Sequence, residues 1–196
     1  MPYLRHGFTL FRRFFKVLEF SRDEALRTGW HNIGADHIVL GILRHAENGA
    51  YYALEALGAD PELFKTHIDE AVFVNEEVPW NERESVHFCE SALSLLQHAS
   101  LEAMRCKSEE VAPIHFLLAV CRISGSYSHD YLDGLGISLR ALVEASGLDW
   151  SHYGLGKQPA APSESETNSL PSPSLLAAAI EKRLREGYTT DNPLVS

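Results

Sequence analysis

The chain has 196 residues, of which 45% are hydrophobic and 22% are charged, and its formal net charge is −10 at pH 7. This composition is typical of a soluble globular protein. A surface with this excess of carboxylates repels phosphate backbones and anionic lipid, which argues against nucleic acid and membranes as partners. We expect protein partners instead, and basic segments of such proteins fit the charge best.

The three cysteines, Cys89, Cys106 and Cys121, lie in apolar patterns typical of helices. An odd number with this placement indicates reduced thiols in a cytosolic protein rather than a disulfide framework. No apolar run approaches the roughly 20 residues that cross a bilayer, and the first residues lack the basic and apolar regions of a signal peptide. We therefore expect a cytoplasmic location.

An internal repeat dominates the sequence, because residues 8 to about 69 recur from 86 to about 147 at a constant offset of 78 positions. Self-similarity of this kind fixes the architecture before any motif is interpreted. The strongest correspondences are Glu-Ala-Leu-Arg at 24–27 with Glu-Ala-Met-Arg at 102–105, Ile-Gly-Ala-Asp-His at 33–37 with Val-Ala-Pro-Ile-His at 111–115, and Leu-Gly-Ile-Leu-Arg at 40–44 with Leu-Ala-Val-Cys-Arg at 118–122. The sequence thus predicts an all-α domain over residues 1–153, built of two tandem copies, about 8–74 and about 86–150.

Each copy is predicted to contain four helices. In the first copy, apolar residues from Phe8 to Ala25 recur at spacings of three and four, which indicates a long helix that ends at Gly29. A second helix opens at Asp36, a third runs from about residue 50 to 57, and a fourth begins at an N-cap, Asp60.

In the second copy, Pro113 marks the start of the second helix and Ser138 that of the fourth. Residues 75–83 form a polar hinge between the copies. No segment shows sustained alternation of period two, so strands are not expected.

The composition changes after Tyr153. Residues 154–173 are rich in Pro, Ser and Glu and are expected to form a flexible linker. Residues 174–187 are predicted to form an amphipathic helix with an apolar stripe of Leu176, Ile180 and Leu184, followed by a tail over 188–196. The helix is either a docking element for a partner or a strut that folds back on the repeats, and the sequence leaves both open.

The motifs of the first copy carry a family resemblance. Phe8-Thr9, the Glu-Ala of residues 24–25, Gly29, the Ile-Gly-x-x-His of residues 33–37 and the Leu-x-x-Leu-Gly of residues 54–58 resemble the paired repeat of the N-terminal domain of Clp ATPases. The resemblance covers about residues 8–148. It implies an all-helical, pseudo-two-fold domain, the double Clp-N fold, which binds adaptors and substrates and does no chemistry itself.

The AAA+ modules of a Clp unfoldase are not seen in this sequence. Each would need Gly-x-x-x-x-Gly-Lys-Ser/Thr to cradle nucleotide phosphates, and residues 154–158 (Gly-Leu-Gly-Lys-Gln) match only by chance. The sequence therefore indicates a free-standing copy of the N-terminal domain with a short tail. No cofactor is expected.

The resemblance also suggests where a ligand would bind. Some family members hold phosphorylated arginine in a small pocket of each repeat, with contributions from the Thr of Phe-Thr and the Glu of Thr-Glu-His. Here the first copy offers Thr9 and Asp36, whereas the second offers His87 and Ile114 and so lacks the carboxylate. The alternative is that Asp36 only stabilises the start of its helix. An exposed Trp80 in the hinge would mark a further contact site.

Histidine and cysteine chemistry is the main alternative to a binding role. His37 and His115 occupy equivalent positions, which favours a structural role, a ring packed between helices and bonded to the backbone, over a metal ligand or general base. No ligand pair has zinc-site spacing. Cys121 is a core position by symmetry, and Cys106 has no identifiable partner base.

Taken together, the residues and the resemblance predict a non-catalytic protein-interaction module of the Clp chaperone–protease system. It would bind a Clp ATPase, a Clp protease subunit, adaptors or client proteins as an adaptor or accessory regulator. A helical interaction module that serves secretion or stress signalling is the alternative, and a His/Cys metal-binding protein or enzyme is a weaker one. The sequence does not reveal the oligomeric state.

Overall fold

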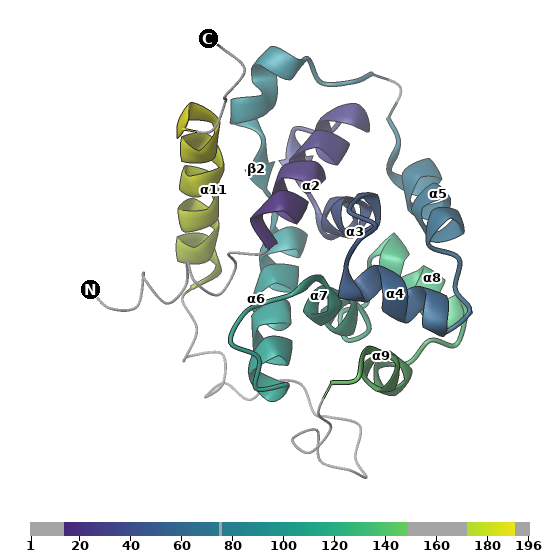
Figure 1. Cartoon of the computed structure of the whole chain (residues 1–196). Coiled ribbons are helices and arrows are strands. Elements are labelled where there is room, and N and C mark those ends of the chain that lie inside the picture. The colour runs from purple at the N-terminus through teal and green to yellow at the C-terminus, as the bar shows by residue number, and fades with distance from the viewer. Residues whose placement is uncertain (1–13, 75, 149–171, 191–196) are drawn as a thin grey trace.

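The computed structural model describes residues 14–74, 76–148 and 172–190. The first copy contains α2 (Phe15–Arg27), α3 (Ala35–Arg44), α4 (Gly49–Ala56) and α5 (Pro61–Val72), and the second contains α6 (Glu90–Arg105), α7 (Pro113–Val120), α8 (Tyr127–Gly134) and α9 (Leu139–Ser146). A 3₁₀ helix, η2 (Trp80–Ser85), precedes the second copy, and α11 (Pro173–Thr190) lies near the C-terminus (Figure 1). The all-α fold predicted from the sequence is confirmed.

Side-chain caps place several of the helix starts. The Asp60 carboxylate accepts hydrogen bonds from the N–H groups of Glu62 and Leu63, and the Ser138 hydroxyl accepts one from Ala141. These caps satisfy backbone donors that have no partner inside the helix. Pro113 occupies the first turn of α7, where its missing N–H costs nothing. These three predicted helix starts are confirmed.

The first helix of each copy ends in a left-handed residue, but the residue type differs. Gly29 has φ +86° and Lys107, its counterpart, has φ +51°. A Cβ on Gly29 would lie 2.4 Å from the carbonyl oxygen of Glu76, so the chain beyond α5 passes too close for any side chain. Glycine is therefore required by the passing segment as well as by φ.

A second glycine allows α2 and α3 to pack closely. A Cβ on Gly41 would lie 2.5 Å from the Ser21 hydroxyl and 2.7 Å from the Val17 carbonyl oxygen. The backbone of α3 thus rests directly against α2, and this is the most extensive helix pair among the described residues. Ala119 and Ala99 occupy the equivalent positions in the second copy.

The two copies pack reciprocally. Helix α4 contacts α7 and α9 of the second copy, and α8 contacts α3 and α5 of the first, as pseudo-two-fold symmetry requires. Aromatic rings join the copies, since Phe14 stacks on Phe116 with centroids 3.9 Å apart and Phe64 on Tyr131 at 4.5 Å. The fully buried residues of both copies belong to one continuous core, so each copy completes the burial of the other.

The expectation that the chain has no strands is wrong in one detail. Residues 32–33 (β1) and 87–88 (β2) form a two-residue parallel pair, in which the Cys89 N–H donates to the Ile33 carbonyl at 3.0 Å. The pair joins the link between the first two helices of copy one to the start of copy two. Two residues are too few to produce an alternating pattern, so the sequence carries no signal for it.

The C-terminal helix folds back on the repeats. Helix α11 lies against α6, with Ala177, Ile180 and Leu184 buried (Figure 1). It is longer than the predicted 174–187, and Gly187 lies within it rather than at its end. Ile180 and Leu184 of the predicted stripe are confirmed as buried, while the Leu176 side chain lies outside the described part. Of the two roles left open, the structure shows the strut.

A buried carboxylate between two arginines recurs in both copies. In the second copy Glu102 is fully buried, and its oxygen lies 2.5 Å from both Arg105 Nη1 and Arg122 Nε. In the first copy, buried Glu24 lies 2.7 Å from Arg27 Nη2 and 3.1 Å from Arg44 Nη1. The network ties the C-terminal end of the first helix to that of the second. The network explains why Glu and Arg occupy equivalent positions in the two copies.

We expect Glu102→Gln to lower the free energy of unfolding by about 2–4 kcal/mol, because it removes the buried negative charge that pairs with the largely buried guanidinium groups of Arg105 and Arg122. Urea denaturation measures the change. The matched control is Glu144→Gln, which removes the carboxylate of an exposed pair with Arg140 and should cost no more than about 0.5 kcal/mol. Equal effects in both variants would contradict a structural role for the buried network.

Candidate partner-binding site

Asp36 lies at the junction of the two copies. Its carboxylate accepts hydrogen bonds from the backbone N–H groups of Ser128 at 2.9 Å and Tyr127 at 3.3 Å, and from the Ser128 hydroxyl at 2.5 Å. These donors belong to the first turn of α8, so Asp36 of the first copy caps a helix of the second. A carboxylate has about four acceptor positions, and donors from the described residues occupy three of them.

These contacts bear on the predicted phospho-arginine pocket. Thr9 lies outside the described residues, so its relation to Asp36 stays a prediction. Ile114 replaces Asp36 in the second copy and is buried, so that copy has no carboxylate at this position. Recognition of a guanidinium by Asp36 also stays a prediction. The cap across the copies could not be predicted from a local pattern, because its hydrogen bonds join residues 91 and 92 positions apart.

Trp80 begins η2 in the hinge and is the most exposed aromatic residue described, at 63% of its surface. The Arg83 guanidinium lies over its ring, 4.1 Å from the ring centroid, and Arg83 also pairs with Asp23 of α2 at 3.0 Å. The ring is therefore held in place by a cation–π contact that is itself anchored to α2. A rigid, exposed indole is well suited to contact another protein.

A second apolar area lies where the segment that follows α5 contacts the segment that follows α2. Trp30, Phe73 and Val74 are each more than 40% exposed. They are held together because the Trp30 indole donates to the Val72 carbonyl at 2.6 Å and the Val74 N–H donates to the Thr28 carbonyl at 2.9 Å. Both described tryptophans are thus largely exposed, although tryptophans at such boundaries are commonly buried. Trp150 lies outside the described residues.

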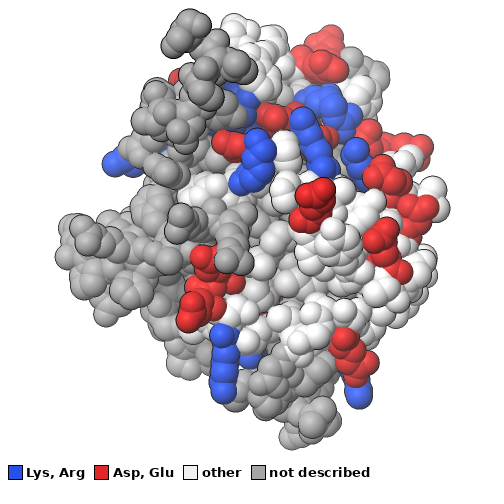
Figure 2. Space-filling model, viewed as in Figure 1, with Lys and Arg blue, Asp and Glu red and all other residues white. Residues whose placement is uncertain are grey.

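The charged side chains are distributed unevenly over the visible face. Asp and Glu gather over α4 and α5, where the exposed carboxylates are Glu47, Glu55, Asp60, Glu62 and Glu70 (Figure 2). Lys and Arg gather over α2 and the end of α3. The acidic side supports the expectation that a basic segment of a partner would be attracted to this surface.

His37 and His115 have a structural role, as their recurrence indicated. The N–H of residue 34 donates to His37 Nδ1 and that of residue 112 to His115 Nδ1, each at 2.9 Å. Each histidine is thus the third residue of its helix, and its imidazole accepts a hydrogen bond from the backbone of the N-cap residue. In a capping box, Glu or Gln has this role. Because Nδ1 accepts, the ring is neutral and Nε2 carries the hydrogen, which points to the hydroxyl of Thr28 or Ser108.

The remaining nucleophile and metal candidates do not come together. Burial raises the pKa of the Cys121 thiol to about 12, which suppresses the reactive thiolate, and Cys106 is also buried. Within residues 14–74, 76–148 and 172–190, no three His, Cys, Asp or Glu side chains are grouped as a metal ion would need. In the same ranges, no helix has the length and apolar character to cross a membrane.

The histidine pair predicts a pH dependence of stability. Burial lowers the pKa of His37 and of His115 to about 4, and for His37 the positive charge of Arg27 adds to the effect. The unfolded chain, with a histidine pKa near 6.5, binds more protons between these values. Stability is therefore intact above pH 6.5 and falls as the pH drops toward 4, by up to about 3 kcal/mol per histidine.

Denaturation at a series of pH values tests this. We expect the double variant His37→Gln, His115→Gln to flatten the slope between pH 6.5 and 4, because Gln keeps the bond to the N-cap but does not titrate. His31→Gln, which changes an exposed histidine, should leave the slope as it is. An unchanged slope in the double variant would show that other groups cause the acid sensitivity.

We expect Asp36→Ala to lower the free energy of unfolding by about 1–2 kcal/mol, because it removes the cap that joins the copies. Thermal denaturation measures the change, and Asp133→Ala, near the other end of α8, is the control. Titration of free phospho-arginine into the unmodified chain by calorimetry tests the pocket separately. Saturable binding that Asp36→Ala abolishes would establish the carboxylate as a ligand, and no binding would leave it as a cap alone.

Comparison with known proteins agrees with this architecture. Over 124 residues the chain is 32% identical to the protein named negative regulator of genetic competence ClpC/MecB of Bacillus subtilis and 31% identical to chaperone protein ClpB of Oceanobacillus iheyensis. Each of these matches covers 63% of this chain but 15% of the relative. Chloroplastic chaperone protein ClpC1 of Arabidopsis thaliana is 44% identical over 66 residues, which is 34% of this chain and 7% of the relative.

The chain therefore spans only a small part of the length of the curated relatives that it matches. The family described as the Clp repeat (R) N-terminal domain matches residues 10–135, which span most of the first copy and the second copy as far as the end of α8. This confirms the resemblance carried by the motifs of the first copy. Because the match covers more than half of its residues, the chain belongs to the Clp repeat N-terminal domain family.

Proposed function

We propose that this protein is a non-catalytic protein-interaction module of the Clp chaperone–protease system. It binds a Clp ATPase, Clp protease subunits, adaptors or client proteins, and acts as an adaptor or accessory regulator. The observation that carries the proposal is the match of residues 10–135 to the Clp repeat N-terminal domain. The similarity to the ClpC and ClpB relatives covers 15% of each of those longer chains.

The surface of the repeats supports a binding role. The exposed aromatic and aliphatic side chains of the hinge region are held by Arg83, the Val72 carbonyl and the Thr28 carbonyl rather than left loose. Ordered aromatic side chains lose little conformational entropy on binding, which favours their use as contact residues. We place the principal contact at Trp80 for this reason.

The interior supports the same reading, because the residues that repeat between the copies are already engaged with one another. Glu24 and Glu102 are paired with arginines, and His37 and His115 bind helix N-termini. Each of these groups stabilises its own copy. The duplicated polar residues thus explain the fold and leave the exposed hinge surface for partners.

Binding of purified Clp ATPase and Clp protease subunits from the source cell to the immobilised full-length chain tests the proposal. We expect saturable binding at low ionic strength to at least one of them. Trp80→Ala should weaken it at least about tenfold, roughly 1.4 kcal/mol, because truncation of a central aromatic residue removes a large share of the binding energy.

Leu135→Ala is the control, since Leu135 is 51% exposed but belongs to the second copy. The affinity of the Leu135→Ala variant for the Clp subunit should stay within about twofold of the affinity of the unmodified chain. The absence of saturable binding to every Clp subunit at low salt would overturn the proposed function. Binding that Trp80→Ala leaves unchanged would overturn only the placement of the contact.

A further inference from the structure

We infer that α11 fills, within its own chain, a groove that binds an amphipathic helix of a partner protein. The partner helix would carry small and aliphatic residues at positions i, i+3 and i+7 and a carboxylate at i+4. The groove is distinct from the hinge surface around Trp80, and the inference does not depend on the proposed Clp partner.

The apolar stripe of α11 defines the first part of this recognition. Ala177, Ile180 and Leu184 are between 2% and 7% exposed and join the same continuous core as the repeats. Their spacing of three and four places them on one face of the helix. Leu175 is 59% exposed, so the helix has a distinct outer face. This arrangement is that of an amphipathic helix laid in a groove.

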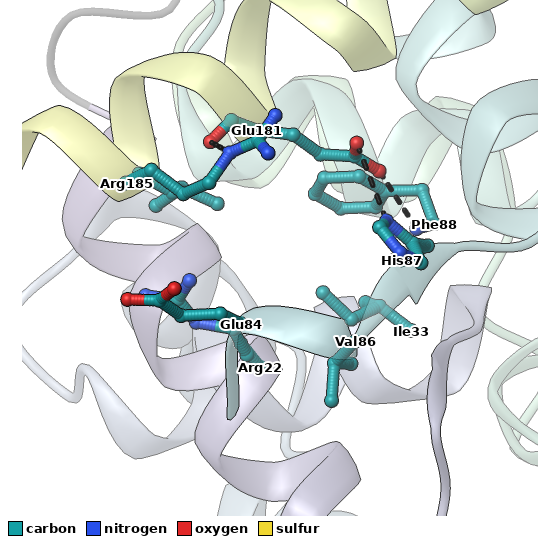
Figure 3. Close-up of a pocket in the computed structure, with 9 residues that line it drawn as sticks. Arg22, Ile33, Glu84, Val86, His87, Phe88, Glu181 and Arg185 are labelled. Atoms are coloured by element: carbon teal, nitrogen blue, oxygen red, sulfur yellow. Dashed lines mark hydrogen bonds and ion pairs between the residues drawn. The ribbon is translucent and has the colours of Figure 1, made fainter. Parts of the chain in front are cut away.

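Glu181 defines the second part, because its carboxylate binds the free edge of the small β pair. The N–H groups of His87 and Cys89 donate toward β1, so the N–H of Phe88 points away from β1, as alternation along a strand requires. One Glu181 oxygen accepts from this N–H at 3.3 Å, and the other lies 3.5 Å from His87 Nδ1 (Figure 3). The Phe88 N–H, which belongs to the repeats, thus donates its hydrogen bond to a carboxylate of α11, which lies outside the repeats.

The fit of α11 is incomplete. A small hollow remains beneath the helix, between Glu181, Leu184 and Arg185 on one side and Arg22, Ile33 and Val86 on the other (Figure 3). Gaps of this kind forfeit dispersion contacts that a well-packed interface would have. Among the side chains of α11 that the structure describes, three aliphatic ones are buried in the contact. A single helix of this length is marginal when it is undocked. A better-fitting helix can therefore displace it.

The connection of α11 to the repeats favours a partner protein over a second copy of this chain. The helix belongs to the same chain as the groove, and a covalent connection raises the effective concentration of a binding element at its site. An identical helix on a second copy gains no contact and loses this advantage at micromolar concentration. A helix from another protein must therefore bind the groove more tightly than α11 does. A helix with the same pattern but a different sequence can meet this requirement.

A labelled peptide of residues 172–190, used with full-length protein, tests the inference by fluorescence anisotropy. The unmodified chain should bind the peptide weakly, because its own α11 competes. Ile180→Asp with Leu184→Asp in the chain releases α11, so peptide affinity should rise at least tenfold. Leu175→Asp, a matched change on the outer face of α11, should leave the affinity unchanged. A peptide carrying Glu181→Ala should bind the opened chain at least fivefold more weakly than one carrying Lys182→Ala.

A second experiment covers the case in which the double variant does not fold. A protease site placed in residues 149–171 allows the linker to be cut in the otherwise unmodified protein. The cut α11 should remain bound and should be displaced by excess peptide, as size-exclusion chromatography would show. Equal peptide affinity in closed and opened chains, no effect of Glu181→Ala, or a cut helix that no peptide displaces would overturn the inference. A peptide-independent dimer would assign the groove to a second copy instead.

Discussion

The rest of this structure depends on the mutual burial of two apolar faces. A single copy of the repeat has helices too short to enclose a core of their own, so α4 packs on α7 and α9 while α8 packs on α3 and α5. The aromatic stacks Phe14–Phe116 and Phe64–Tyr131 lie on this shared surface. Hydrophobic burial is the largest favourable contribution to folding, and here each copy obtains part of it from the other.

The residues that the two copies share and those in which they differ serve different purposes. Shared polar groups act within a copy, as the buried glutamates with their arginines and the two capping histidines do. Two of the differences occur where the first copy meets something that is not repeated. Gly29 lies under the Glu76 carbonyl of the segment that follows α5, and Asp36 caps α8. At these two positions, divergence between the copies accompanies a contact that the other copy does not repeat.

Local signals in the sequence were sufficient for most of the fold. The spacing of apolar residues, the caps at Asp60 and Ser138 and the offset of 78 positions predicted the helices and their duplication. The β pair, the cap by Asp36 and the contact of Glu181 with Phe88 were missed, because each joins residues distant in sequence through one or two hydrogen bonds. Such contacts follow from the packing of whole helices, which no local pattern encodes. Thr9 and the proposed linker lie outside the described residues and stay predictions.

The claim that the two copies form one interdependent unit, which presents a surface for binding, is tested most directly by native-state hydrogen exchange followed by mass spectrometry. The buried amides of α3 and α7 should exchange through a single opening reaction, with equal free energies and equal dependence on denaturant. If one copy opens at a distinctly lower free energy while the other stays protected, the copies are independent and the central claim is wrong.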